Sequence, residues 1–126
     1  IGVGVDIVDN TRIKNLIKNK NFITRIFSKK EINQSKKIKN KINYYSKRFA
    51  AKEAFSKATG SGISKNIFLK DIEIKKNKKG KPSIKLNNNT ILYLKKKFKA
   101  KSFKINLSLS DEKNYSIAYV IFEKKW

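Results

Sequence analysis

The chain has 126 residues and a formal net charge of +23, with 32 lysines and arginines against 9 acidic residues, and it contains neither histidine nor cysteine. The lack of cysteine excludes disulfides, thiolate nucleophiles and zinc–thiolate sites, and it is compatible with a reducing cytoplasm. The lack of histidine leaves acid–base chemistry to carboxylates, amines, tyrosines or metal-bound water. No apolar run approaches the roughly 20 residues of a membrane span. Without a Pro/Gly/Ser-rich linker, the length predicts one domain over residues 1–126.

The positive charge has two competing explanations. Lysine, asparagine and isoleucine are over-used while arginine occurs only as Arg12, Arg25 and Arg48, a composition expected from an AT-rich genome. Lysine on solvated surfaces has little effect on folding, so this explanation is sufficient. The alternative is a small basic nucleic-acid-binding protein in which the aromatic residues of segment 44–49 stack on bases. The spacing of these aromatic residues fits a helical core instead, so nucleic acid is not the partner that we expect.

The first third of the chain predicts a strand followed by helices. Residues 3–8 are apolar at nearly every position, which is typical of a central strand, and Asp6 within it is expected to point into the protein. Asp6 could be a cap or turn residue, but we favour a functional role. Residues 11–18 predict an amphipathic helix with a basic outer face. A short apolar turn is expected over residues 22–27, before a capping box at residues 28–31 that starts another helix.

A long helix is predicted for residues 42–59, ending at Gly60 and Gly62. It carries one carboxylate, Glu53, among alanines and phenylalanines, and such a carboxylate is costly to desolvate unless a cation meets it. Lys57 lies four residues later. The simpler interpretation is that Glu53 and Lys57 form an exposed ion pair on the helix, worth roughly 0.3–0.5 kcal/mol. The functional alternative is that Glu53 faces a metal ion and a phosphate-bearing ligand.

The second half of the chain predicts strands around one helix. Residues 71–74 and 83–86 alternate between apolar and polar side chains and predict a hairpin, in which Gly80 permits a positive φ. Asparagines at 88–89 can cap a helix that reaches residue 98. Residues 103–110 and 115–123 alternate again and predict a final antiparallel strand pair.

Three separated segments resemble a known family. They are Gly4-Val5-Asp6-Ile7-Val8, Arg48-Phe49-Ala50-Ala51-Lys52-Glu53-Ala54 with Lys57-Ala58 and Gly60, and the strand pair from Ser108 to Ala118. Together with the hairpin motif Gly80-Lys81-Pro82, they are similar in order and spacing to holo-[acyl-carrier-protein] synthases, the bacterial 4′-phosphopantetheinyl transferases. The resemblance runs essentially from end to end.

This resemblance implies an α+β fold in which an antiparallel sheet wraps around a central helix, in a single domain that forms homotrimers with interfacial active sites. It implies cytoplasmic, Mg²⁺-dependent transfer of the phosphopantetheine arm of coenzyme A to a serine of an acidic apo acyl carrier protein, for fatty acid biosynthesis. Asp6 and Glu53 map to the magnesium ligands and, with Lys57, to the catalytic residues. Mg²⁺ prefers oxygen ligands and commonly takes one or two carboxylates. Lys57 would add positive charge at the pyrophosphate, and Arg48 would bind a phosphate such as the 3′-phosphate.

Further site residues are also implied by the resemblance. Asn106 departs from the family pattern, because many relatives have histidine there; asparagine can hydrogen-bond a phosphate but cannot titrate near neutrality. A catalytically decayed or broadened transferase is therefore a third hypothesis. The acceptor of the serine proton stays open between a metal-bound water and a nearby carboxylate. The implied contacts to coenzyme A are Arg48, Lys57, Gly80, Lys81, Pro82, Asn106 and Ser108, and the implied carrier-protein docking residues are Arg12, Lys14, Lys18 and Arg25.

Overall fold

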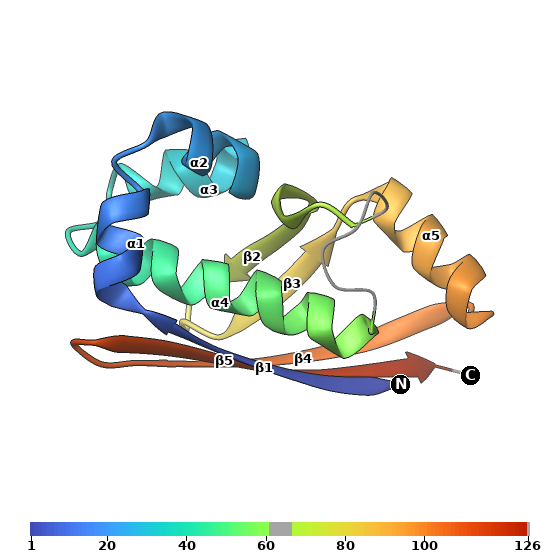
Figure 1. Cartoon of the computed structure of the whole chain (residues 1–126). Helices are drawn as coiled ribbons and strands as arrows, with labels where there is room; N and C mark the ends of the chain where they lie inside the picture. Colours follow the sequence, from blue (N-terminus) through green and yellow to red (C-terminus); the bar gives the residue numbers. More distant parts are fainter. Residues whose placement is uncertain (61–66, 126) are drawn as a thin grey trace.

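A computed structural model of the chain describes residues 1–60 and 67–125. Figure 1 shows a three-stranded sheet as one layer, with the long helix α4 lying along one of its faces. The helices α1, α2 and α3 gather near the N-terminal end of α4, and α5 lies near its C-terminal end (Figure 1). The elements are β1 (Gly2–Asp9), α1 (Asn10–Leu16), α2 (Lys20–Ile26), α3 (Lys29–Ser35), α4 (Lys41–Thr59), η1 (Leu69–Asp71), β2 (Ile72–Lys76), β3 (Pro82–Leu86), α5 (Asn88–Phe98), β4 (Ser102–Asp111) and β5 (Tyr115–Lys125).

The three-stranded sheet is antiparallel in the order β1-β5-β4, and its two faces differ. On the face toward α4, here called the inner face, Ala118, Val120 and Phe122 of β5 are fully buried. Phe122 stacks edge-on against Phe55 of α4, with ring centroids 5.4 Å apart. No described element covers the opposite face, here called the outer face (Figure 1). Its apolar side chains are exposed: Val3, Val5, Ile7, Tyr115, Ile117 and Tyr119.

The prediction that β1 is a central strand is wrong. It lies at the edge of the sheet, and its outward-pointing Val3, Val5 and Ile7 are 60%, 54% and 61% exposed. A strand that is apolar on both faces indicates that both faces are covered, but the pattern does not say whether the same chain covers them. Asp6 does lie on the inner face, because it alternates with these residues.

Close packing of β1 on α4 requires glycine at positions 2 and 4. A Cβ placed on Gly4 would overlap the carbonyl oxygen of Ala54, and one placed on Gly2 would overlap that of Ala58. Only glycine permits this approach of strand backbone to helix backbone. The contact sets Asp6, two residues beyond Gly4, beside α4.

The predicted central helix is confirmed as α4, which begins after Asn40. The Asn40 side chain accepts a hydrogen bond from Asn43 N, and the helix ends at Gly60, whose φ of 75° is left-handed. Gly62, the other predicted stop residue, lies outside the described residues. Alanines at 50, 51 and 54 are fully buried, so α4 is enclosed on several sides rather than amphipathic.

The N-terminal helices agree with the sequence in part. The capping box of Ser28 and Glu31 is present at the start of α3. The expected apolar turn at 22–27 is instead the helix α2, which Asn19 caps and which buries Phe22 and Ile26 one turn apart. A seven-residue helix gives little periodic signal, which is why the sequence pattern predicts only a turn here.

The aromatic residues that could have stacked on nucleic-acid bases are buried. Tyr44, Tyr45 and Phe49 are 5%, 3% and 7% exposed. Phe49 packs against Phe22, Tyr45 packs against Phe27, and Tyr44 packs edge-on against Tyr45. They therefore offer no stacking platform, and the nucleic-acid alternative loses its aromatic support.

The predicted C-terminal elements are confirmed. The hairpin β2–β3 pairs Ile72 with Leu86 and Lys76 with Pro82, and Gly80 in its turn has a φ of 85°. The helix α5 is present, but its N-cap is Asn87 rather than the predicted asparagines at 88–89, which are the first residues of the helix. β4 pairs with β5 over its whole length. Among the described helices, none combines the length and hydropathy that crossing a bilayer requires.

Candidate active site

The two predicted metal ligands lie on neighbouring elements: Asp6 is on β1, and Glu53 is on α4 together with the predicted Lys57. Lys57 Nζ lies 3.0 Å from Asp6 Oδ1 and donates a second hydrogen bond to Val5 O at 3.1 Å. Glu53 lies one helical turn before Lys57. Burial and the negative charge of Asp6 raise the pKa of Glu53, while Lys57 and Arg12 oppose that shift. The charge of Asp6 therefore acts on Glu53 across the contact between β1 and α4.

The donor set fits magnesium. Two like charges in a partly buried site repel each other unless a cation joins them, and here Lys57 neutralises one of them. Within residues 1–60 and 67–125, no group of three or more acidic side chains could hold a metal ion. Mg²⁺ is commonly bound by one or two carboxylates with waters and substrate phosphates, so Asp6 and Glu53 suffice when a phosphorylated substrate supplies further ligands.

Arg48 does not join this site within one chain. It lies five residues before Glu53, which is about 140° around the helix. Its guanidinium carbon is 3.6 Å from the centroid of the Tyr44 ring, and Nη1 donates to Tyr44 O at 3.3 Å. Arg48 is 4% exposed and its Nε is buried with no hydrogen-bond partner in the described structure. Within a single chain, Arg48 therefore lies apart from Glu53 and Lys57, although all three are on α4.

Arg48 instead faces a cavity of about 270 Å³ that also contains Lys47, Lys76 and Asp111. Lys47 Nζ is 3.6 Å from Asp111 Oδ1, the one carboxylate in its lining. Burial, followed by the positive charges of Lys47 and Arg48, lowers the pKa of Lys76. Three cations and one carboxylate therefore line the cavity. The net charge of this lining is positive, which favours an anionic ligand.

The predicted nucleotide loop adjoins this cavity. Lys76 is paired with Pro82 across the β2–β3 hairpin, so the motif Gly80-Lys81-Pro82 continues from the cavity wall. Asn77 organises the turn, because its Oδ1 accepts hydrogen bonds from Lys79 N and Lys81 N. The structure therefore brings Arg48 and the hairpin together, apart from Asp6 and Glu53.

Asn106 and Ser108 form a third group, on the outer face of the sheet. They are exposed and lie opposite Ile121 and Tyr119 in the β4–β5 register. Asp6 lies on the inner face of the same sheet. Because successive side chains of a strand point to opposite faces, residues of the two faces cannot contact one small ligand within a single chain.

The four predicted docking residues are exposed around α1 and α2. Arg12 and Lys14 lie in α1, Lys18 lies in the turn after it, and Arg25 lies in α2. Arg12 also acts electrostatically on Glu53, which connects this basic surface to the metal site. Arg25 borders a largely apolar cavity of about 320 Å³, lined also by Ile26, Phe68 and Leu69.

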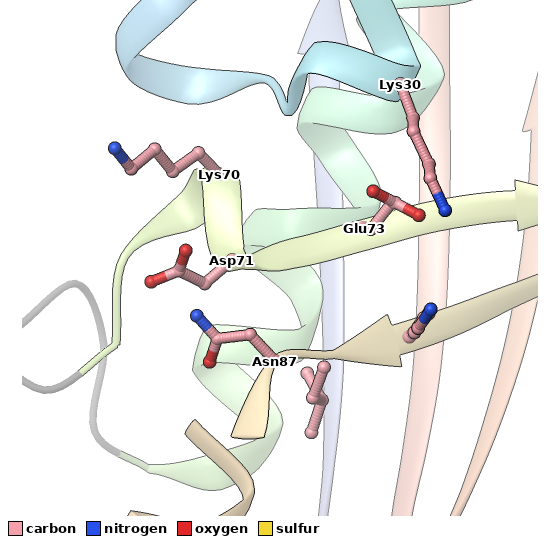
Figure 2. Close-up of a pocket in the computed structure, with 7 residues that line it drawn as sticks. Lys30, Lys70, Asp71, Glu73 and Asn87 are labelled. Carbon is pink, nitrogen blue, oxygen red and sulfur yellow. The ribbon is translucent and has the colours of Figure 1, made fainter. Parts of the chain in front are cut away.

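A further small pocket, of about 130 Å³, lies between α3 and the hairpin (Figure 2). Lysines at 30, 70 and 85 surround its two carboxylates, Asp71 and Glu73. It contains none of the predicted site residues, so it is separate from the candidate active site.

Comparison with known proteins identifies the family. The family model described as "4'-phosphopantetheinyl transferase superfamily" matches residues 2–120. The chain belongs to this superfamily. The holo-[acyl-carrier-protein] synthase of Pelagibacter ubique is 55% identical over 125 residues, which cover 99% of this chain and 98% of that protein. The synthase of Ehrlichia chaffeensis is 46% identical and covers 96% of this chain and 94% of its own length.

Solved structures of the superfamily have the same fold. The synthase of Neisseria meningitidis superposes with a TM-score of 0.87 at 34% identity, covering 98% of each chain. The Helicobacter pylori synthase in complex with coenzyme A gives a TM-score of 0.82 at 31% identity and covers 96% of this chain and 99% of that one. The predicted family and α+β fold are therefore confirmed.

Proposed function

We propose that this transferase moves the 4′-phosphopantetheine group of coenzyme A to a serine of an apo acyl carrier protein, for fatty acid biosynthesis in the cytoplasm. The convergence of Asp6, Glu53 and Lys57 on the inner face of the sheet carries this proposal. The names of the most similar relatives describe the same activity, and one solved relative binds coenzyme A.

In the reaction, the serine oxygen bonds to the β-phosphorus of coenzyme A, and the bond from that phosphorus to the bridging oxygen breaks. Adenosine 3′,5′-bisphosphate leaves with the negative charge that develops on this oxygen. Lys57, whose side chain is 55% exposed, is free to move from Asp6 toward the phosphates and neutralise that charge. Because the chain has no histidine, the carboxylates of Asp6 and Glu53 are the described bases nearest the reacting groups.

Asp6 and Glu53 would hold Mg²⁺, and the bound ion would polarise the pyrophosphate as a Lewis acid. Lys57 Nζ donates a hydrogen bond to Asp6 Oδ1, so Lys57 and the cation would both interact with this carboxylate.

The nucleotide end of coenzyme A is assigned to the cationic cavity of Lys47, Arg48 and Lys76. Arg48 is held against Tyr44 with an unused Nε, and a planar guanidinium suits a phosphate such as the 3′-phosphate. The hairpin motif Gly80-Lys81-Pro82 would contact the nucleotide from the adjoining side.

A homotrimer joins these groups. The cavity, the metal site and the outer-face pair Asn106 and Ser108 are separated in one chain, whereas a neighbouring subunit can bring its own cavity or outer face to the metal site. The outer face is apolar and uncovered, which is typical of an interface between copies. Its exposed valines, isoleucines and tyrosines would then be buried in the assembly.

The basic surface of Arg12, Lys14, Lys18 and Arg25 would dock an acidic acyl carrier protein. Opposite charges raise the association rate, and they make the apparent affinity sensitive to salt. A KM for the carrier protein that did not change between low and high ionic strength would contradict this docking surface.

The deciding experiment incubates the purified protein with coenzyme A, Mg²⁺ and apo acyl carrier protein. Mass spectrometry is expected to show a 4′-phosphopantetheine mass gain on one carrier serine. A folded, coenzyme-binding protein that gave no mass gain, as the decayed-transferase hypothesis predicts, would refute the proposed activity. Omitting Mg²⁺ is the matched control.

A further inference from the structure

A buried ion pair connects the helical end of the molecule to the hairpin. Lys52 is 0% exposed and Glu31 is 1% exposed, and Lys52 Nζ lies 2.7 Å from Glu31 Oε1. Lys52 is on α4, directly before Glu53, and Glu31 is on α3. Burial lowers the pKa of Lys52, and the adjacent Glu31 carboxylate opposes this. Burying two charges costs several kcal/mol of desolvation per ion, which only a favourable geometry with further hydrogen bonds can offset.

The remaining hydrogen bonds of the pair go to the start of the hairpin. Lys52 Nζ donates to Leu69 O at 2.9 Å and to Ile72 O at 2.6 Å, so all three of its protons are used. Glu31 Oε2 accepts a hydrogen bond from Ile74 N at 3.2 Å. Ile72 O and Ile74 N lie on the edge of β2 that β3 does not pair. The ion pair therefore takes the place of a neighbouring strand along this edge.

The same junction has a second contact at the surface. Ser28 Oγ, at the N-cap of α3, donates to Glu73 Oε2 at 2.9 Å. Figure 2 shows Glu73 on β2 with its carboxylate beside the Lys30 side chain that descends from α3. The cap residue Ser28 also donates its backbone N–H to Glu31 at 2.9 Å, so the buried pair and the surface contact share one helix start.

β2 leads from this junction to Lys76 and the turn, and thus to the cationic cavity. The orientation of β2 against α4 sets how far the Gly80-Lys81-Pro82 turn lies from Arg48, which is on the same helix as Lys52. If the ion pair contributed only to stability, apolar residues could replace it, since such replacements are often neutral or stabilising. Apolar residues could not form the directional hydrogen bonds to Ile72 O and Ile74 N.

We propose that Lys52 and Glu31 are positioning residues for the nucleotide end of coenzyme A, because they fix the edge of β2 and so the hairpin relative to Arg48. This rests on the proposed function, and neither side chain touches substrate. Lys52 directly precedes the proposed metal ligand Glu53. It therefore connects the hairpin to the helix that would hold the metal.

The test uses the double variant Glu31→Gln/Lys52→Met, which removes both charges but keeps an acceptor for Ile74 N. We expect its KM for coenzyme A and its Kd for adenosine 3′,5′-bisphosphate to rise about tenfold or more, because a small misplacement of binding groups has effects of this size. Its KM for the carrier protein should change less than about twofold, and amides of residues 74–81 should exchange faster with deuterium.

The matched control is Tyr45→Phe. It removes another buried hydrogen bond between α4 and α3, from Tyr45 to Ser35 Oγ at 2.8 Å, without touching β2. It should lower stability and leave the coenzyme KM unchanged. Unchanged coenzyme binding in the folded double variant, or equal changes in both KM values, would overturn the proposal. Should the double variant not fold, Glu31→Gln alone is judged by the same criteria.

The direct measurement of adenosine 3′,5′-bisphosphate affinity separates this proposal from the activity. A wild-type chain that binds the nucleotide but transfers nothing contradicts the proposed function alone. A wild-type chain that transfers normally, with a double variant of unchanged nucleotide affinity, contradicts the positioning role alone.

Discussion

The two faces of the three-stranded sheet both carry apolar side chains from β1 and β5, but only the inner face is covered by another element of the chain. The inner face is closed so tightly on α4 that Gly2 and Gly4 leave no room for a Cβ, and it places Asp6 beside Lys57. The outer face presents exposed valines, isoleucines and tyrosines together with Asn106 and Ser108. Asp6 and Lys57 therefore meet within the chain, whereas Asn106 and Ser108 face away from them; in the proposed homotrimer a second copy would bring the separated groups together.

The largest expected effect comes from the inner face. Glu53→Gln removes one of the two carboxylates proposed to hold Mg²⁺, and transfer should fall about 10³-fold, the several kcal/mol that a metal supplies to charge stabilisation. Mg²⁺ at 100 times its Kd should stabilise the wild-type protein by about 2.7 kcal/mol, and this gain should vanish in the variant. Thermal unfolding with and without Mg²⁺ measures it; a variant with full Mg²⁺ stabilisation would contradict the metal site.

The outer face should be almost as sensitive, through assembly. Tyr119→Lys introduces a charge at the centre of the apolar surface, and we expect separate chains and a loss of transfer of about 100-fold. Light scattering after size exclusion measures the mass. Leu92→Lys is the control, because Leu92 is 64% exposed on α5, away from this face. A Tyr119→Lys protein of unchanged mass would show that the outer face is not the interface.

The tightness of the inner face is tested by Gly4→Ala. The added methyl group would overlap Ala54 O, so we expect a loss of about 3 kcal/mol or more in the free energy of unfolding. The displaced strand should also weaken Mg²⁺ binding, since Asp6 follows two residues later. Gly80→Ala is the matched control: it strains a turn with positive φ in open space and should leave Mg²⁺ stabilisation intact. Equal Mg²⁺ responses of the two variants would argue against strand placement as the cause.

The smallest expected effect is a pH dependence of the metal-free protein. Burial and Asp6 raise the pKa of Glu53 above its usual value. Between the usual and the raised pKa, the folded protein holds more protons than the unfolded chain, so stability falls as pH rises through this window. Glu53→Gln should lack that decline. Denaturant unfolding in EDTA at several pH values compares the two proteins, and a difference independent of pH would contradict the assigned shift.

The sequence predicted what depends on local signals and short spacing. The capping box of Ser28 and Glu31, the stop at Gly60 and the alternation of β4 and β5 all appear in the structure. Asp6 and Glu53 were paired as metal ligands through family resemblance alone, and this pairing stays a prediction.

What the sequence did not predict depends on contacts between distant segments. The sequence around Lys52 does not indicate that Glu31, 21 residues earlier, forms an ion pair with it in the core. Arg48 and Glu53 belong to one sequence motif and one helix, but they lie on different sides of that helix. The exposure of the outer side chains of β1 could not be predicted. An apolar pattern is the same whether a face is covered by the same chain or by another chain.

Subunit complementation tests the divided site most directly. Glu53→Gln disables the inner-face half, and Arg48→Met disables the cationic cavity while keeping the length of the side chain. Each variant alone should be inactive. If the halves of one site come from neighbouring subunits, co-expression in equal amounts should restore about a quarter of the wild-type activity, because one site in about four then combines two intact halves. A mixture of folded, co-assembled chains no more active than either variant alone would contradict the account.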